Sequence, residues 1–314
     1  MKIVFMGTPD FAVPSLLALH AAGHEIVACI TREDAPKGRK MILTPPPVKV
    51  AAMELGIPVY QPKTLRDDAF ASLLCELDPE LIAVVAFGKL LPENVLNYPK
   101  YGCINVHGSL LPEYRGAAPM QRAIMDGKTV TGITTMFMDI GMDTGDMLLT
   151  AEHNIGENET YGEMAVTLAE IGAELLVKTV ELAKEGKLVR TVQDHSKATH
   201  AEKIDRAEEE LDFSLEASAL HNKVRALSPA PMCRAYTPAG SLLKIAKTLV
   251  SDIKTSAPAG TVIEADKKFI VACGNGTALE ISELVPEGKQ KMNAADYLRG
   301  RKLFCGDMLR GKKE

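Results

Sequence analysis

An amide and an imidazole lie two residues apart in the stretch "NVHGSLLPEYRG" at 105–116, next to an apolar run. In an extended strand, side chains two residues apart point to the same face, so Asn105 and His107 share one. An Asn amide donates hydrogen bonds, and a His can move protons near neutral pH. Asp143, in the polar stretch "DIGMDTGD" at 139–146, could orient that His.

This combination suits acyl transfer, which needs donors for a developing oxyanion and a group that moves protons. No side-chain nucleophile is obvious, because Ser109 lacks the G-x-S-x-G elbow and Cys103 is more typical of a core position. The pattern therefore favours direct attack by a substrate amine over a covalent intermediate. The alternative is a capping Asn beside a buried, hydrogen-bonded His. Arg115 could be a surface charge.

Motifs for nucleotide cofactors and metals are missing. After Gly7 the next glycine is Gly23, so "MGTPDF" does not continue as G-x-G-x-x-G, and no G-x-x-x-x-G-K-[ST] occurs. His20 and His24 are four residues apart, but no third ligand is evident, and we expect no metal. The six cysteines form no Cys-x-x-Cys pair, which argues against a zinc site or disulfide framework and favours a reducing cytoplasm.

Composition indicates a globular protein with one large or two modest domains, since 314 residues are 46% hydrophobic. No stretch reaches the roughly 18 to 20 apolar residues of a membrane span. The net charge of −5 excludes a generic polyanion binder, but residues 217–314 hold 16 basic and 9 acidic side chains. This uneven balance suggests that one end meets an anion, the alternative being a mixed solvated surface.

Apolar strands alternate with helices in the first half of the chain, which predicts a parallel sheet covered on both faces. Neighbouring strands are expected at 131–139 and 146–155, and a long helix opens with Thr160 and Glu163 in capping-box spacing. The Pro-rich segment 32–49 is expected to be a long loop. The predicted parallel strands are 2–7, 25–31, 81–88 and 103–108.

Three polar clusters follow predicted strands, namely "GTPDF" at 7–11, "NVHGSLLP" at 105–112 and "DIGMDTGD" at 139–146. Ligands of open parallel sheets bind outside the carboxyl ends of the strands. Loops from separate strands could therefore converge on one site.

The amino-acid composition of the chain changes after the long helix. Few apolar residues occur in the segment that begins at "LVRTVQDHSK", which predicts a catalytic domain at 1–189, a linker at 190–206 and a second domain at 207–314. A helix at 214–227 is followed by short strands, and "GNG" at 274–276 is expected to be a hairpin turn. This pattern is typical of a small β-barrel of oligonucleotide-binding (OB) type.

"NVHGSLLPEYRGAAP" together with "DIGMDTGD" resembles the folate-dependent formyltransferases, and the similarity runs along nearly the full chain. "MKIVFMGTPDFAVPSLLAL", "APKGRKMILTPPPVK" and "AFGKLLP" resemble the branch of that family that acts on charged initiator tRNA, as do the C-terminal "KIDRAEEELDFSLEASALHNKVRALSPAPMCRAYT" and "YLRGRKLFCGDML". Phe213, Ala230 and Met232 depart from the family pattern at aromatic and turn positions of the second domain.

The resemblance implies a Rossmann-like formyltransferase domain followed by an OB-like barrel. It also implies 10-formyltetrahydrofolate as donor and the methionine amino group of initiator methionyl-tRNA as acceptor, for translation initiation. No metal and no membrane are expected, and we expect a cytoplasmic monomer. The implied residues are Asn105, His107 and Asp143 for catalysis; Ser109, Leu110, Leu111, Pro112, Phe87, Gly88 and Leu90 for folate; and Lys37, Arg39 and Lys40 for tRNA.

Three other functions are compatible with parts of the sequence. A formyltransferase acting on a sugar-nucleotide amine would share the donor and the three catalytic residues, but the basic loop at 34–43 argues against so small an acceptor. A single-domain purine-pathway formyltransferase would lack the residues beyond about 210. A non-catalytic RNA-binding protein would have no physical need for Asn105, His107 and Asp143 together.

Overall fold

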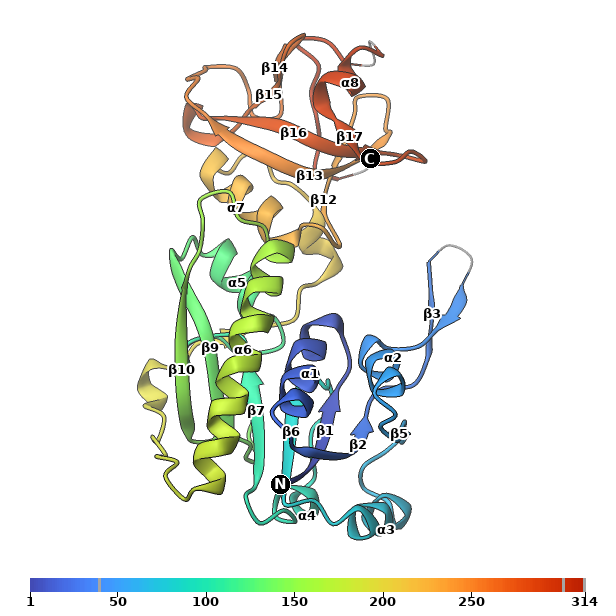
Figure 1. Ribbon diagram of the computed structural model, residues 1–314. Coiled ribbons are helices and arrows are strands. Elements are labelled where there is room, and N and C mark those ends of the chain that lie inside the picture. Colours follow the sequence, from blue (N-terminus) through green and yellow to red (C-terminus); the bar gives the residue numbers. More distant parts are fainter. Residues whose placement is uncertain (39–40, 301–302, 313–314) are drawn as a thin grey trace. The chain divides into compact units, whose positions relative to one another are not determined.

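The computed structural model describes residues 1–38, 41–300 and 303–312. The chain forms two compact units, each built from several stretches of sequence (Figure 1). Unit 1 comprises Met1–Pro119, Thr131–His153 and Ala165–Ala201, and unit 2 comprises Met120–Val130, Asn154–Met164 and Glu202–Glu314.

Unit 1 is built on a seven-stranded mixed sheet (Figure 1). In sheet order, its strands are β10 (Met147–Asn154), β9 (Val130–Phe137), β7 (Cys103–His107), β6 (Leu81–Val85), β1 (Lys2–Gly7), β2 (Glu25–Ile30) and β5 (Val59–Tyr60). Strands β7, β6, β1, β2 and β5 are parallel to one another, and β9 is antiparallel to β7. The predicted parallel strands and the predicted pairing of the two later strands are confirmed.

Helices cover both faces of this sheet, as the apolar strands predicted. On one face, Phe70 and Leu74 pack with Val95 and the strand side chains in a single core cluster. On the other, the helix that contains Gly172 lies so close to β7 and β9 that a Cβ there would touch Val106. The helices are α1 (Val13–Ala21), α2 (Pro47–Glu54), α3 (Asp68–Leu77), α4 (Glu93–Leu96) and α6 (Tyr161–Lys184).

Local signals explain where two of these helices begin. The side chain of Asp67 accepts a hydrogen bond from the Phe70 backbone at the start of α3. At the start of α6, the Glu163 carboxylate accepts from the Thr160 backbone at 2.8 Å, and the Thr160 hydroxyl accepts from the Glu163 backbone at 3.3 Å. The predicted capping box is therefore confirmed.

The Pro-rich segment after β2, predicted as a loop, contains a small hairpin instead. Strand β3 (Ala35–Lys37) pairs antiparallel with β4 (Ile42–Thr44). The prolines in this segment argue against a strand, which is why the hairpin was not predicted. A two-stranded edge hairpin tolerates proline because few of its N–H groups need hydrogen-bond partners. Its root is held by Lys49, whose ammonium donates to the Asp34 carboxylate at 2.8 and 2.9 Å and to Gln61 at 2.9 Å.

Unit 2 contains an antiparallel sheet, as predicted for the C-terminal part. In order, its strands are β12 (Cys233–Tyr236), β13 (Leu242–Ser251), β16 (Ala278–Pro286), β15 (Phe269–Ala272) and β14 (Val262–Ala265), with β17 (Met292–Asn293) paired to β16. The chain end joins the two edges, because Arg310 bridges to Tyr236 of β12 and Met308 bridges to Thr261 beside β14. This closure is the barrel feature that the short strands predicted.

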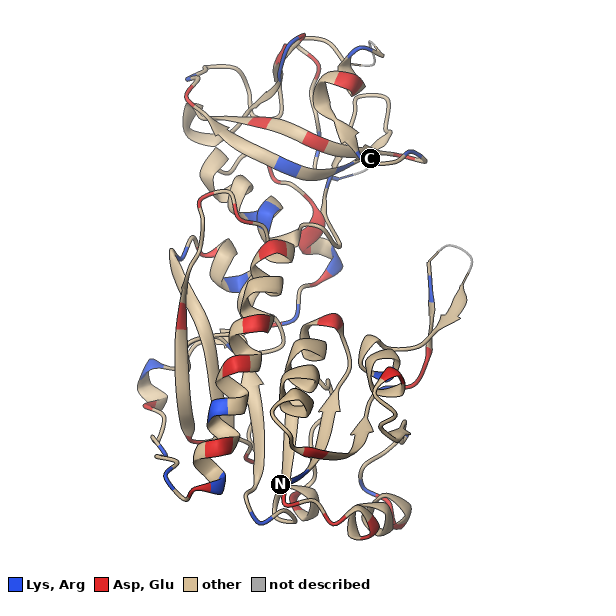
Figure 2. Ribbon diagram, viewed as in Figure 1, with Lys and Arg blue, Asp and Glu red and all other residues tan. Residues whose placement is uncertain are grey.

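The helices of unit 2 include α5 (Pro119–Met125), α7 (Ala217–Leu227) and α8 (Ala294–Leu298). Leu220, Val224 and Leu227 of α7 are buried in the same core cluster as the inward side chains of the sheet. Acidic and basic residues are interspersed over the barrel (Figure 2), and two of its lysines pair with glutamates at 2.7 Å, Lys268 with Glu280 and Lys291 with Glu283.

The segment predicted as a linker, 190–206, is folded against unit 1 over most of its length. It holds a short strand, β11 (His200–Ala201), which pairs in parallel with β8 (Arg115–Gly116). Gln193 is only 3% exposed. The boundaries of independently folding domains stay a prediction.

No helix in the described ranges is long and apolar enough to cross a membrane. Within the same ranges, no group of three or more His, Cys, Asp or Glu side chains is arranged to hold a metal ion.

Candidate active site

The polar cluster predicted from sequence lies at the end of β7, in the middle of the unit 1 sheet. Asn105 pairs with Val84 of β6 and Met136 of β9, and it is half-buried. His107 ends the strand and is 5% exposed. Because residues two apart in a strand share a face, the amide and the imidazole lie on the same side of the sheet.

His107 is hydrogen-bonded at one ring nitrogen and has a carboxylate near the other. Its Nε2 lies 2.9 Å from the carbonyl oxygen of Tyr114, and its Nδ1 lies 3.6 Å from Oδ2 of Asp143. A carbonyl can only accept, so the hydrogen-bond partner places a proton on Nε2. The 3.6 Å separation is an ion-pair distance but is too long for a hydrogen bond.

Asp143 reaches His107 by a route that the sequence did not predict. Strand β9 runs against β7, so Phe137 at its end lies beside Ile104, near the beginning of β7. The loop after β9 must therefore return along β7 to bring Asp143 to His107, instead of emerging at the same sheet edge. At Asp143 the backbone adopts a φ of 54°, and its Oδ2 accepts from the Gly116 N–H at 2.8 Å.

Neither nearby nucleophile is available for covalent chemistry. Ser109 is fully buried, and its hydroxyl donates to the Glu113 carbonyl oxygen at 2.6 Å. Burial raises the pKa of the Cys103 thiol to about 12, so this sulfur stays protonated near neutral pH. Neither Ser109 nor Cys103 is therefore set up as a nucleophile.

The residues predicted for folate binding follow the ends of two adjacent parallel strands, β6 and β7. The Phe87 side chain is 2% exposed and packs in the core, while its carbonyl oxygen accepts from the Thr8 hydroxyl at 3.1 Å. Gly88 has a φ of 78°, and Leu90 is 60% exposed. After β7, the buried residues are Ser109 and Leu111, and the half-buried ones are Leu110 and Pro112.

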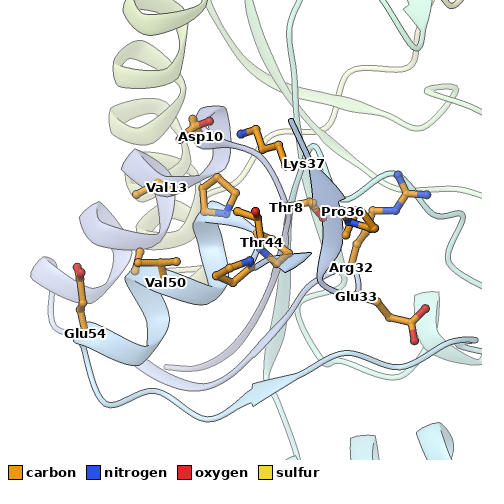
Figure 3. A pocket seen from close by; sticks show the side chains of 15 residues that line it. Thr8, Asp10, Val13, Arg32, Glu33, Pro36, Lys37, Thr44, Val50 and Glu54 are labelled. Atoms are coloured by element: carbon orange, nitrogen blue, oxygen red, sulfur yellow. The ribbon is translucent and has the colours of Figure 1, made fainter. Parts of the chain in front are cut away.

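The residues predicted for tRNA binding fall on the β3–β4 hairpin. Lys37 is exposed on β3, whereas Arg39 and Lys40 lie outside the described residues. Lys37 and Arg32 line an open pocket of about 690 Å³ at the ends of β1 and β2 (Figure 3). Its other lining residues are Thr8, Asp10, Val13, Glu33, Ala35, Pro36, Thr44, Pro45, Pro46, Pro47, Val50, Ala51 and Glu54.

Two side chains beside the cluster were not predicted to matter. Arg115 is 5% exposed, so its interpretation as a surface charge is wrong. Its guanidinium donates to Gln193, and the Gln193 amide donates to the carbonyl oxygens of Asp143 and Gly145. No local pattern could have found this pair, because Arg115 and Gln193 are 78 residues apart.

The pattern of the formyl transferase family matches residues 1–180, and that of the formyl transferase C-terminal domain matches residues 203–302. The chain belongs to the formyl transferase family. A methionyl-tRNA formyltransferase of Bacillus licheniformis is 45% identical, over 97% of this chain and 96% of that protein. One from Bacillus cytotoxicus is also 45% identical, over 98% of each chain.

Solved structures share the fold at much lower identity. The N-formyltransferase of Helicobacter canadensis, solved with folinic acid and dTDP-3-aminofucose, aligns with a TM-score of 0.69 and 18% identity, over 93% of this chain and all of that one. HypX of Aquifex aeolicus, solved with tetrahydrofolic acid, aligns with a TM-score of 0.67 and 15% identity, over 95% of this chain and 47% of that one. The predicted formyltransferase architecture is therefore confirmed.

Proposed function

We propose that this formyltransferase moves a formyl group from 10-formyltetrahydrofolate to the α-amino group of methionine on initiator methionyl-tRNA. The product is N-formylmethionyl-tRNA for translation initiation. The observation that carries this proposal is the 45% identity to methionyl-tRNA formyltransferases over nearly the whole length of both chains. The cluster of Asn105, His107 and Asp143 supplies groups suited to that reaction.

The first step is attack of the neutral amine on the formyl carbon. A carbon–nitrogen bond forms, and the carbonyl electron pair moves onto oxygen, giving a tetrahedral intermediate. Asn105 donates its amide N–H to that oxygen. The Nδ1 position of His107, beyond hydrogen-bond range of Asp143 at 3.6 Å, is open to the same oxygen when the ring is protonated.

The second step breaks the bond between the formyl carbon and N10 of the folate. The oxygen's electron pair re-forms the carbonyl, the attacking nitrogen loses a proton, and N10 gains one. Asp143 is the group placed to accept the amine's proton, directly or through a water, since its Oδ1 has no role in the Gly116 hydrogen bond. Oδ2 of Asp143, 3.6 Å from Nδ1, also lies close enough to orient the His107 ring.

Folate and tRNA are assigned to different parts of unit 1. Ser109, Leu110, Leu111 and Pro112 form the folate segment, with Phe87, Gly88 and Leu90 around the pteridine. For Phe87 the backbone is the contacting part, because its side chain is in the core. Lys37, Arg39 and Lys40 are assigned to the phosphates of the acceptor stem, whose attraction is electrostatic and salt-dependent. Protein residues alone carry the chemistry, without a metal, in a cytoplasmic monomer.

The deciding experiment incubates the purified protein with 10-formyltetrahydrofolate and either methionyl initiator tRNA or an amino-sugar nucleotide. We expect formyl-methionine on hydrolysis of the tRNA product and no transfer to the sugar. Transfer to the sugar alone would keep the proposed chemistry and overturn the proposed acceptor. No transfer to either would overturn both.

A further inference from the structure

We propose that Arg115 and Gln193 are positioning residues that form a latch under Asp143, an inference that rests on the proposed catalytic role of Asp143. The latch is defined as the hydrogen-bonded chain from the Arg115 guanidinium through the Gln193 side-chain amide to the loop backbone at Asp143 and Gly145. Nothing in the proposed reaction requires either residue to touch a substrate.

Every polar group of the Gln193 side chain is used. Its Oε1 accepts from Arg115 Nε at 3.0 Å and from Arg115 Nη2 at 2.6 Å. Its Nε2 donates to the carbonyl oxygen of Asp143 at 2.9 Å and to that of Gly145 at 2.7 Å. A guanidinium has only donors and a carbonyl only accepts, so just one orientation of the amide satisfies all four contacts.

Both side chains of the latch are buried. Arg115 is 5% and Gln193 3% exposed, so water does not compete for these hydrogen bonds. The second neighbour of the guanidinium is His195, whose Nδ1 lies 3.2 Å from Nη2. Because the guanidinium cannot accept, that imidazole nitrogen presents its lone pair, and the arginine is held from two sides.

Two contacts hold Asp143 in a left-handed backbone conformation. Its φ of 54° is uncommon for most residues with a side chain, although Asp adopts it several-fold more often than most. Gln193 holds the carbonyl of Asp143, and the Gly116 N–H holds its carboxylate at 2.8 Å. Through Gln193, Arg115 therefore holds the backbone from which this carboxylate projects.

The sharpest variant is Gln193→Glu. The Glu side chain has the same shape as Gln and still accepts hydrogen bonds from Arg115, so the buried guanidinium stays paired. Its carboxylate cannot donate to the carbonyl oxygens of Asp143 and Gly145. A misplacement of reacting groups by about 1 Å costs on the order of 100-fold in rate. We expect kcat to fall about 100-fold, with KM for 10-formyltetrahydrofolate and for methionyl-tRNA changed less than about threefold. Gln290→Glu, at an exposed position, is the matched control and should leave kcat within about twofold.

A measurement independent of activity tests the latch itself. Hydrogen exchange of the Gly116 amide reports whether the Asp143 carboxylate is in place, and the Ala117 amide, bonded to Ala201, reports whether the segment remains folded. We expect Gln193→Glu to speed Gly116 exchange at least about tenfold and to leave Ala117 unchanged. No change at Gly116, or equal changes at both amides, would overturn the latch.

A double-mutant cycle separates the latch from the proposed role of Asp143. If Gln193 acts through Asp143, then Gln193→Glu should lower kcat less than about threefold in an Asp143→Asn background. An equal 100-fold loss in both backgrounds would overturn the proposal. If Asp143→Asn alone leaves kcat unchanged, the catalytic role of Asp143 fails, and Gly116 exchange then decides the latch by itself.

Discussion

Two hydrogen-bond networks of unit 1 are built alike and differ in burial. In each, a Gln joins a charged side chain to a backbone carbonyl: Gln193 connects Arg115 to Asp143, and Gln61 connects Lys49 to the carbonyl of Arg32 at 2.6 Å. The latch residues are 3–5% exposed, whereas the side chains of Lys49 and Asp34 are 22% and 25% exposed.

This difference matches what each network holds. In the proposed mechanism the latch supports a carboxylate that acts on a reacting group and has to be placed closely, and burial favours one arrangement. The network at the hairpin root holds only the chain next to the start of β3 and the end of β4. Met41, Ile42 and Leu43 at the far end are 61–66% exposed, which leaves the hairpin surface free to meet a large partner.

The largest effect should come from the imidazole of the cluster. His107→Ala removes the proposed cation beside the developing oxyanion, and we expect kcat to fall at least about 1,000-fold. Circular dichroism should show an intact fold. His20→Ala, at an exposed position of α1, is the control and should behave like the parent protein. Unchanged turnover in His107→Ala would remove this residue from the mechanism.

Asn105→Ala should have the next largest effect. One lost oxyanion donor costs roughly 100- to 1,000-fold in kcat, with little change in KM, because the donor is used only as charge develops. Steady-state rates measured against each substrate would check this, with exposed Asn97→Ala as control. A rise in KM at constant kcat would instead make Asn105 a ground-state binding residue.

Arg39→Ala should weaken the binding of methionyl-tRNA without changing the rate of formyl transfer. We expect KM for methionyl-tRNA to rise about tenfold. The slope of log affinity against log salt concentration should become less steep by about 1, which corresponds to one phosphate contact fewer. KM for 10-formyltetrahydrofolate should stay within about twofold. Lys178→Ala, on the exposed side of α6, controls for the loss of one positive charge. Equal losses toward both substrates would exclude the proposed role of the hairpin.

The smallest effect concerns the hairpin root and depends on pH. Hydrogen bonds from Lys49 and Gln61 lower the pKa of Asp34 below its ordinary 3.8. A depressed folded-state pKa means that the carboxylate contributes stability above about pH 4 and loses it as pH falls through the lower value. Lys49→Met should return the pKa toward 3.8, measured by carboxyl NMR titration, and raise KM for methionyl-tRNA about threefold. An unshifted titration would show that Lys49 does not hold the root.

The sequence was informative wherever the signal is local. Asn105 and His107 were placed on one strand face because strand periodicity needs only adjacent residues. The capping box at Thr160 and the apolar strands were readable for the same reason. Burial on both faces follows from an unbroken apolar run, which is why the strand at 81–88 predicts a sheet covered on both faces.

Features that depend on distant contacts were missed. The direction of β9 is set by its pairing with β7 and cannot be predicted from the β9 sequence alone. The path of the loop to Asp143 depends on that direction. Arg115 looked exposed because its partner Gln193 lies in a stretch with few apolar residues. The β3–β4 hairpin was hidden by prolines, which lower strand propensity wherever they occur.

The interleaving of the two units has a consequence for synthesis on the ribosome. All residues of unit 1 have been made once the chain reaches Ala201, whereas unit 2 needs residues 120–130, 154–164 and everything after 202. Residues 120–130 and 154–164 are therefore made before the part of unit 2 that they pack against, which begins at residue 202. The barrel is closed by residues 308–310, so its two edge strands stay open to pairing with other chains until those residues have been made.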